Sequence, residues 1–236
     1  SNFDGSAGLA AVVTKPSNEI KSAIFTDSRY KLQTSLQLSS QWQSYISGEK
    51  NVPKLTDWLK DVMPTSRVGF DPRFSSISQV ERWQTALKNT SVALVEVLDN
   101  PVDKVWEAMG RPPPPSAPIW PLADHLSGAT TATKVAELRK CMKKKGSSVA
   151  VVSALDDVAW LLNLRGGDIP YTPLFLAYCV VGQESGVTLC AHSSQLGKEA
   201  IDTLSKAGVD VREYEDIAEV LLEATAVTTE EGKEGE

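Results

Sequence analysis

Hydrophobic and polar positions alternate along the first half of the chain with two periods, one typical of strands and one typical of helices. Short β-prone runs at 9–14 and 20–26 flank Lys15-Pro16-Ser17-Asn18, whose composition favours a turn, so together they predict a β-hairpin. Further helices are expected at 30–38, 54–63 and 78–87, and further strands at 42–46, 67–70 and 92–98. This interleaving predicts an α/β fold, a sheet covered by helices.

The second half repeats this alternation, although the two halves share no residue pattern that aligns. Helices are expected at 130–145, 155–162, 195–206 and 217–222, and strands at 149–152, 174–181, 187–190 and 209–212. A second α/β domain is therefore predicted. Large aromatic residues are expected to anchor the cores by burial against the sheets, and these are Trp58, Trp83, Trp106 and Trp160.

Proline marks the boundary between the halves. The stretch 110–121 is rich in proline, which fixes φ and lacks the donor that a helix or sheet needs. We therefore expect a first domain at 1–110, a Pro-rich linker at 111–127 and a second domain at 128–225. A polyproline ligand for an adaptor domain is the alternative use of this stretch. Residues 226–236 predict an acidic tail with nothing to bury, or the stub of a link to a further domain.

Composition narrows the choice of partners. With 42% hydrophobic and 23% charged residues among 236, the chain has the make-up of an ordinary globular protein. A formal charge of -6 argues against a nucleic-acid partner, because phosphate binding needs a concentrated basic surface. The basic cluster at 134–145 carries Val135, Leu138 and Met142 at helical spacing. Its basic residues are therefore expected on the solvent side of an amphipathic helix.

Cysteine usage and hydropathy favour a cytoplasmic location. Cys141, Cys179 and Cys190 show neither zinc-site nor disulfide-framework spacing, which suggests a reducing compartment. No apolar run approaches the roughly 18 residues of a membrane span, and no signal peptide opens the sequence. No membrane partner is expected.

Residues with catalytic chemistry are scarce. The two histidines are His125, in the expected linker, and His192, in an expected turn after a strand, and neither has carboxylates at a recognisable ligand spacing. There is no Gly-x-Ser-x-Gly elbow, and each cysteine lies in an apolar or helical context. We therefore expect no catalytic residue and no metal ligand in this chain.

Four motifs nevertheless follow one another in a recognisable order. They are FDGSAG at 3–8 with FTDSRY at 25–30, RVGFDP at 67–72, NPVDKVW at 100–106, and the stretch 153–178. In this order they resemble the two N-terminal domains of Xaa-Pro aminopeptidases (aminopeptidase P) of the eukaryotic cytosolic type. The resemblance implies two creatinase-like α/β domains, each a mixed sheet flanked by helices.

In that family these domains precede a pita-bread metallopeptidase domain with two divalent metal ions, for which manganese is implied. The ligand set of that domain, Asp, Asp, His, Glu and Glu, is not found here, so the chain is interpreted as a fragment that is inactive alone and also begins inside the first domain. The implied parent removes the N-terminal residue before proline from peptides. Its implied partners are peptides with proline at the second position and the catalytic domain, and a homodimer is compatible with the resemblance.

Arg29 is the site residue that the resemblance singles out. In the family, the arginine of this motif reaches the edge of the active-site cleft, where its fork of donors suits a carboxylate or carbonyl of a bound peptide. The alternative is an Arg29 paired with Asp27 or Asp4. Phe3, Asp27 and Tyr30 belong to the same motifs and are expected to hold the loop in shape. Ser28 stands where the resemblance expects glycine, which puts the backbone path of the loop in question.

The segment 164–173 has a structural explanation. Gly166 and Gly167 are expected to end a helix with positive φ, Asp168 to bond nearby amides or to pair with Arg165, and the prolines to extend the loop. A contact with other domains is the alternative. For the whole chain, two alternatives remain open: a stand-alone, non-catalytic binding module, and a creatinase-like amidinohydrolase.

Overall fold

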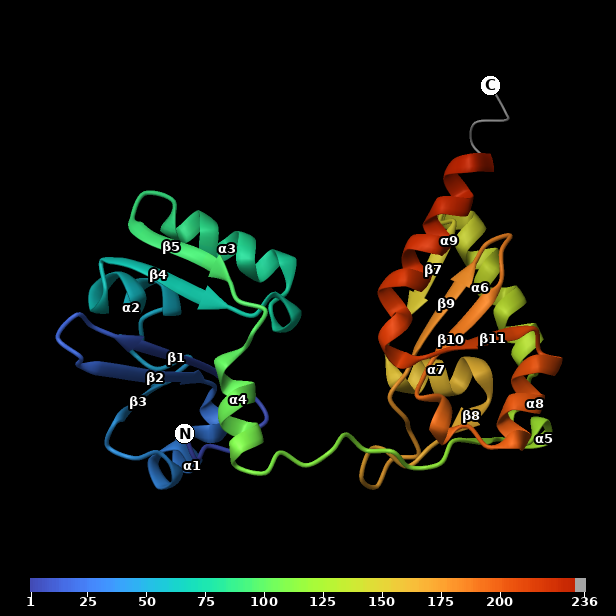
Figure 1. Ribbon diagram of the computed structural model, residues 1–236, viewed down its shortest axis with the longest axis horizontal. Coiled ribbons are helices and arrows are strands. Elements are labelled where there is room, and N and C mark those ends of the chain that lie inside the picture. Colours follow the sequence, from blue (N-terminus) through green and yellow to red (C-terminus); the bar gives the residue numbers. More distant parts are fainter. Residues whose placement is uncertain (232–236) are drawn as a thin grey trace. The chain divides into compact units, whose positions relative to one another are not determined.

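The computed structural model describes residues 1–231, and the chain divides into two units, Ser1–Arg111 and Pro112–Glu236 (Figure 1). Each unit combines strands with flanking helices, which confirms the predicted α/β class. The first unit contains β1 (Leu9–Thr14), β2 (Ile20–Thr26), η1 (Ser28–Tyr30), α1 (Lys31–Gln37), β3 (Trp42–Ile46), α2 (Leu55–Val62), β4 (Thr65–Phe70), η2 (Pro72–Phe74), α3 (Ile77–Leu87), β5 (Ser91–Glu96) and α4 (Pro101–Ala108). The second contains β6 (Trp120–Pro121), α5 (Asp124–Ser127), α6 (Thr131–Lys145), β7 (Val149–Val152), α7 (Leu155–Leu162), β8 (Leu164–Arg165), β9 (Tyr178–Gly182), β10 (Val187–Cys190), η3 (Ser193–Gln195), α8 (Lys198–Lys206), β11 (Val209–Arg212), η4 (Tyr214–Asp216) and α9 (Ile217–Glu231).

The first unit holds a three-stranded sheet, β1-β2-β3, and a two-stranded sheet, β4-β5. β1 and β2 form the predicted hairpin, whose turn places Asn18 at a φ of 62°. β3 runs parallel to β2, and β5 runs parallel to β4. Helix α2 supplies Trp58 and Leu59, which pack with Ala23 of β2 and form the fully buried part of this core. Among the described residues, β1 pairs only with β2 and β4 only with β5. Residues of β1 and β4, with others from α2 and α3, line a hollow of about 420 Å³.

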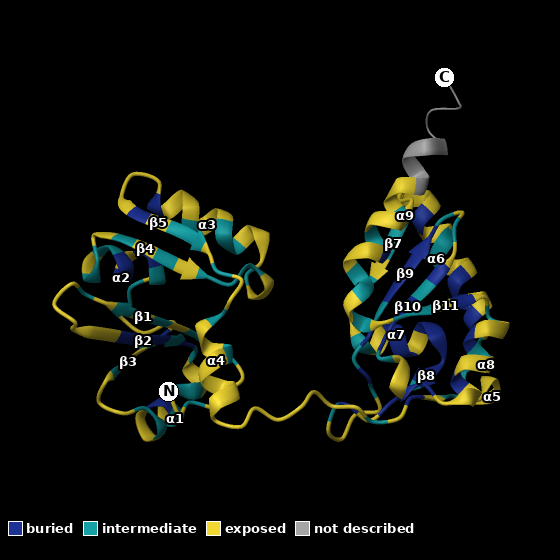
Figure 2. Ribbon diagram, in the orientation of Figure 1, coloured by how far each residue is buried: buried dark blue, intermediate teal, exposed yellow. Residues whose placement is uncertain are grey.

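The second unit is built on a four-stranded sheet in the order β11-β10-β9-β7. β10 and β11 are parallel, whereas β9 is antiparallel to both β10 and β7. Successive residues of β9 point to opposite faces: Cys179 packs with α6, α7 and α8 on one side, and Val180 packs with Val220 of α9 on the other. The strand is therefore buried on both faces, as the dark centre of this unit shows (Figure 2).

Most of the expected Pro-rich linker, residues 111–127, is packed into the second unit. The Ala117 amide donates to Asp168 at 3.0 Å, the Ile119 side chain is 3% exposed, and β6 pairs with β8. Within the expected linker, residues 111–116 make no comparable hydrogen bond or strand pairing with the second unit. The physical reason is that proline is compatible with an extended edge segment such as β6, where its missing donor costs nothing.

The C-terminal helix is longer than expected. It was predicted at 217–222, followed by a tail at 226–236, but α9 continues to Glu231. Val220, Leu221 and Ala224 give it an apolar stripe against the sheet, and the alanines of this stretch favour helix. Residues 232–236 of the expected tail lie outside the described residues. No helix among residues 1–231 is both long and apolar enough to cross a membrane.

Two expectations about burial were wrong. Lys134 does not lie on the solvent side of α6 but is 4% exposed, because its ammonium donates to the Trp160 carbonyl at 2.7 Å and to Asn163 Oδ1 at 2.6 Å. Burial lowers the pKa of Lys134. Trp160 and Trp106 are 53% and 45% exposed and contact cations instead, Trp160 with Lys134 and Trp106 with Arg111.

Candidate functional site

The loop that carries Arg29 is a single turn of 3₁₀ helix, η1, directly after β2. Asp27 caps this turn by accepting from the backbone amide of Arg29 at 3.1 Å. The same carboxylate accepts from Nε of Arg29 at 2.9 Å and from Nη2 at 2.8 Å. Ser28 does not have a positive φ, so the loop does not need the glycine that the resemblance expects there.

Arg29 is both fixed and exposed. Its side chain is 69% exposed, its guanidinium carbon lies 5.3 Å from the centroid of the Tyr30 ring, and Nη1 makes no hydrogen bond within the described part of the chain. The hydrogen bonds from Arg29 lower the pKa of Asp27. Asp27 therefore holds one edge of the guanidinium while the other edge keeps its donors for a carboxylate or carbonyl.

The remaining predicted residues support this loop. The Phe3 ring meets the Tyr30 ring edge to face with centroids 5.7 Å apart, and the Tyr30 hydroxyl is hydrogen-bonded to Ser6. Asp4 does not pair with Arg29, because it accepts from Gln33 and Gln37 of α1. The structure thus brings Phe3, Asp27, Arg29 and Tyr30 together and selects Asp27 over Asp4 as the partner of Arg29.

A second copy of this turn occurs after β4 and was not recognised in the sequence. Asp71 accepts from the backbone amide of Arg73 at 2.9 Å, from its Nε at 3.0 Å and from its Nη2 at 2.6 Å. The shared pattern Asp-x-Arg-aromatic, at 27–30 and 71–74, is the signal that would have revealed it. The copies differ in their further hydrogen bonds. In the second copy, Arg73 also donates to the Leu98 carbonyl at 3.0 Å, and Asn100 donates to Asp71 at 3.2 Å.

The second turn therefore serves to tie the motif at 67–72 to the motif at 100–106. These hydrogen bonds, the one from Arg73 foremost, lower the pKa of Asp71 to about 2. Nη2 of Arg73 thus serves two acceptors and the side chain is 54% exposed, whereas Nη2 of Arg29 bonds Asp27 alone and the side chain is 69% exposed. This difference makes Arg29 the better candidate for contact with a ligand.

The segment 164–173 is organised around the buried carboxylate of Asp168 and is not a reactive site. Asp168 is 6% exposed and accepts from the amides of Ala117 and Leu176 and from Nε2 of Gln195. The suggested pair between Arg165 and Asp168 does not form, because Arg165 donates to the carbonyls of Ala159 and Leu164. Asp168 thereby joins three separate segments of the second unit.

The glycines of this segment are required for a different reason from the one expected. Helix α7 ends at Asn163, which has a φ of 53°, and neither Gly166 nor Gly167 has a positive φ. A Cβ on Gly166 would lie 2.6 Å from Cβ of the buried Phe175. Close packing, not backbone freedom, therefore explains this glycine.

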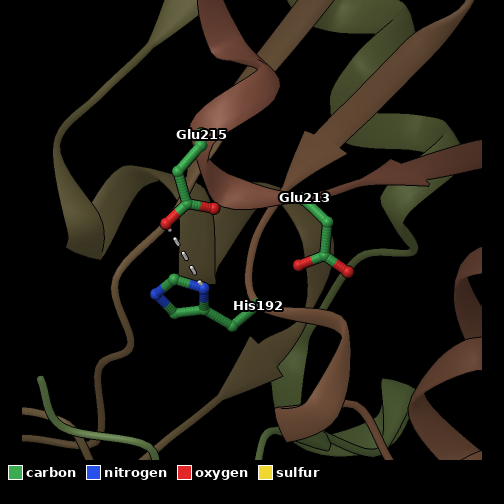
Figure 3. Close-up of side chains that lie close together, drawn as sticks. All are labelled: His192, Glu213 and Glu215. Atoms are coloured by element: carbon green, nitrogen blue, oxygen red, sulfur yellow. Dashed lines mark ion pairs between the residues drawn. The ribbon is translucent and has the colours of Figure 1, made fainter.

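A dinuclear metal centre of the kind that the resemblance implies does not fit the described residues. Within residues 1–231, side chains that could ligate a metal converge at one place, where the ligand atoms of His192, Glu213 and Glu215 all lie within 4.8 Å of one another (Figure 3). This set contains no aspartate and is too small to bridge two ions. His192 was not expected to have carboxylate neighbours. The two carboxylates, of Glu213 and Glu215, come from the residues that follow the C-terminal end of β11.

Comparisons with known proteins agree with this picture. A family profile described as Creatinase/Prolidase N-terminal domain matches residues 110–234, and another with the same description matches residues 1–103. A "Probable Xaa-Pro aminopeptidase P" of Pyricularia oryzae is 38% identical over 239 residues, which cover 99% of this chain and 38% of the relative. Aminopeptidase P2 of Arabidopsis thaliana is 38% identical over 219 residues, which cover 92% of this chain and 30% of the relative. The chain thus spans about a third of the length of these relatives.

A solved structure is similar as well. It is that of X-prolyl aminopeptidase from Caenorhabditis elegans, described as a cytosolic enzyme with a di-nuclear active site. The match has a TM-score of 0.83 at 30% identity and covers 97% of this chain and 37% of that one. The resemblance to the N-terminal domains of Xaa-Pro aminopeptidases is thereby confirmed. With such a domain matched in each half, the chain belongs to the creatinase/prolidase N-terminal domain family.

Proposed function

We propose that this chain is the N-terminal, non-catalytic region of a metal-dependent Xaa-Pro aminopeptidase, which removes the residue before proline from the N-terminus of peptides. The support is the match of nearly the whole chain to about a third of several such proteins. In this proposal the two metal ions, manganese in the first instance, are held by another domain of the parent, because the described residues do not fit a dinuclear centre.

The role proposed for these domains is to shape the entrance to the active site and to position the peptide. Arg29 carries this proposal, since its guanidinium is held by Asp27 on one edge and exposed on the other. An arginine fixed in this way loses little conformational entropy when it binds a carboxylate or carbonyl. Orientation of the peptide by such a contact contributes to the rate of the reaction.

A cytosolic location is proposed for the parent. The support is that Cys141, Cys179 and Cys190 are all free and that the C. elegans relative is described as cytosolic. Burial raises the pKa of Cys179 to about 12, so this thiol is unreactive in the folded protein. Cysteines that form no disulfide are typical of proteins in a reducing compartment.

The Arg29→Ala substitution in the full-length parent is expected to lower kcat/KM for Xaa-Pro peptides about ten-fold, because a hydrogen bond to a charged group contributes roughly 1.5–3 kcal/mol. Steady-state hydrolysis of a Xaa-Pro tripeptide measures this. Arg29→Lys should recover only part of the loss, since an ammonium cannot replace the planar fork.

Arg73→Ala is the matched control, because Arg73 makes the same three hydrogen bonds to an aspartate in the same kind of turn. It should leave kcat/KM nearly unchanged while lowering the stability of the first unit. Equal kinetic losses in both variants would show that the turns act through folding alone. Unchanged kinetics in Arg29→Ala would remove Arg29 from the site.

A further inference from the structure

The ends of two parallel strands in the second unit bring an imidazole and two carboxylates together. β10 and β11 are paired in parallel, with Cys190 opposite Arg212, so the residues that follow each strand emerge at the same edge of the sheet. His192 lies two positions after β10, and Glu213 and Glu215 lie one and three positions after β11. The carboxyl ends of strands are where ligands bind in open α/β sheets.

The side chains at this edge are arranged to face one another (Figure 3). Nδ1 of His192 lies 3.9 Å from Oε1 of Glu215, and the ligand atoms of all three residues are within 4.8 Å of one another. The imidazole contacts the Tyr214 ring in a tilted arrangement with ring centroids 5.2 Å apart, and Glu213 Oε2 accepts from the Ser193 amide at 3.2 Å. These contacts restrict the orientation of His192 and Glu213 from outside the cluster.

The cluster has negative charge that no lysine or arginine neutralises within the described residues. In the described part of the chain, neither Glu213 nor Glu215 pairs with a lysine or arginine. The nearest guanidinium in the sequence, that of Arg212, is taken up by Asp216, Glu219 and Glu223. Neither ring nitrogen of His192 is hydrogen-bonded within residues 1–231. Two carboxylates without a lysine or arginine partner, beside an imidazole without a hydrogen bond, favour a cation that accepts both nitrogen and oxygen ligands.

We propose that His192, Glu213 and Glu215 form a mononuclear site for Zn²⁺ or a similar first-row divalent ion. One histidine and two carboxylates with an open position are a ligand set that such ions accept, whereas Mg²⁺ and Ca²⁺ prefer oxygen alone. Around an ion with bonds of about 2.0–2.2 Å, the ligand atoms lie roughly 3.3 Å apart. The exposed side chains of Glu213 and Glu215 can close that difference by rotation.

Binding at this place would join the ends of β10 and β11. The ion therefore stabilises the folded second unit, because it binds a site that the unfolded chain does not present. This inference does not depend on the proposed aminopeptidase function, since it concerns residues of this chain alone.

The test is Zn²⁺ titration of the 236-residue chain by calorimetry, carried out in a Cys141→Ser background because Cys141 is exposed and thiolate is a competing ligand. We expect one equivalent of saturable binding and a higher Tm with Zn²⁺. Since even the loss of an outer partner weakens metal affinity roughly 10–100-fold, His192→Ala should weaken binding at least ten-fold. Glu213→Gln should weaken it while keeping an acceptor for the Ser193 amide.

His125→Ala is the matched control, because His125 is the other histidine and lies on α5. It should leave Zn²⁺ binding unchanged. Circular dichroism and the Tm without metal should be the same for the control and for His192→Ala, which separates loss of a ligand from loss of folding. Absence of saturable binding, or equal binding by the His192→Ala and His125→Ala variants, would overturn the proposal.

Discussion

Substitution of Asp168 by alanine is expected to lower the free energy of unfolding of the second unit by about 4 kcal/mol. The carboxylate accepts hydrogen bonds from the Ala117 and Leu176 amides and from Gln195 Nε2, and it is 6% exposed. Removing it leaves buried donors without an acceptor, at a cost of roughly 1–3 kcal/mol for each. Chemical denaturation of the wild-type and variant chains, followed by circular dichroism, measures the change.

The control for this substitution is Asp202→Ala, because Asp202 is exposed on α8 and its carboxylate makes no hydrogen bond within the described residues. It should change the free energy of unfolding by less than about 0.5 kcal/mol. Asp168→Asn should lower the free energy of unfolding by an intermediate amount. The asparagine side chain keeps one acceptor oxygen, but its NH₂ group would face donors of the surrounding residues. A loss below about 1 kcal/mol in Asp168→Ala would contradict the assignment of this residue as the organising acceptor of the loop.

The Gly166→Ala substitution is expected to cost about 2–3 kcal/mol in the same unit. The added Cβ would lie 2.6 Å from Cβ of Phe175, whose side chain is fully buried. Neither atom can move without a shift of the backbone, and overpacking of this kind costs roughly 1–3 kcal/mol. The same denaturation experiment reports the loss.

Gly186→Ala is the matched control. Its Cβ would meet Asp210 Oδ2 at 3.7 Å, an ordinary contact, and its φ is not positive. The two substitutions add the same methyl group, so the difference between them isolates the contact with Phe175. If both variants have the stability of the wild type, the segment 164–173 is more adaptable than its packing indicates.

Much of the fold follows from local patterns. The strands at 149–152, 187–190 and 209–212 were predicted with the bounds of β7, β10 and β11, because each is a short run with β-branched residues that follows a serine or a glycine. Helix α4 was missed even though its signals are present: Asn100 caps its first turn and Pro101 occupies the first helical position. The stretch 100–106 was interpreted only as a family motif, so the helix start that it contains was overlooked.

What could not be predicted depends on contacts between distant segments. The burial of Lys134 requires acceptors from Trp160 and Asn163, which no helical period reveals. The meeting of His192 with Glu213 and Glu215 requires the parallel pairing of β10 with β11. The Asp-x-Arg-aromatic turn, in contrast, could have been predicted, because both copies of its pattern are visible in the sequence. The second copy shows that Nη2 of Arg73 also bonds the Leu98 carbonyl, whereas Nη2 of Arg29 bonds Asp27 alone.

The most direct test of the proposed function compares the full-length parent with the 236-residue chain in the hydrolysis of a Xaa-Pro tripeptide, with and without a chelator. The account predicts that the parent releases the N-terminal residue in a metal-dependent reaction and that the chain alone releases none. Cleavage by the chain alone, or a parent that leaves Xaa-Pro peptides intact with metal present, would contradict it.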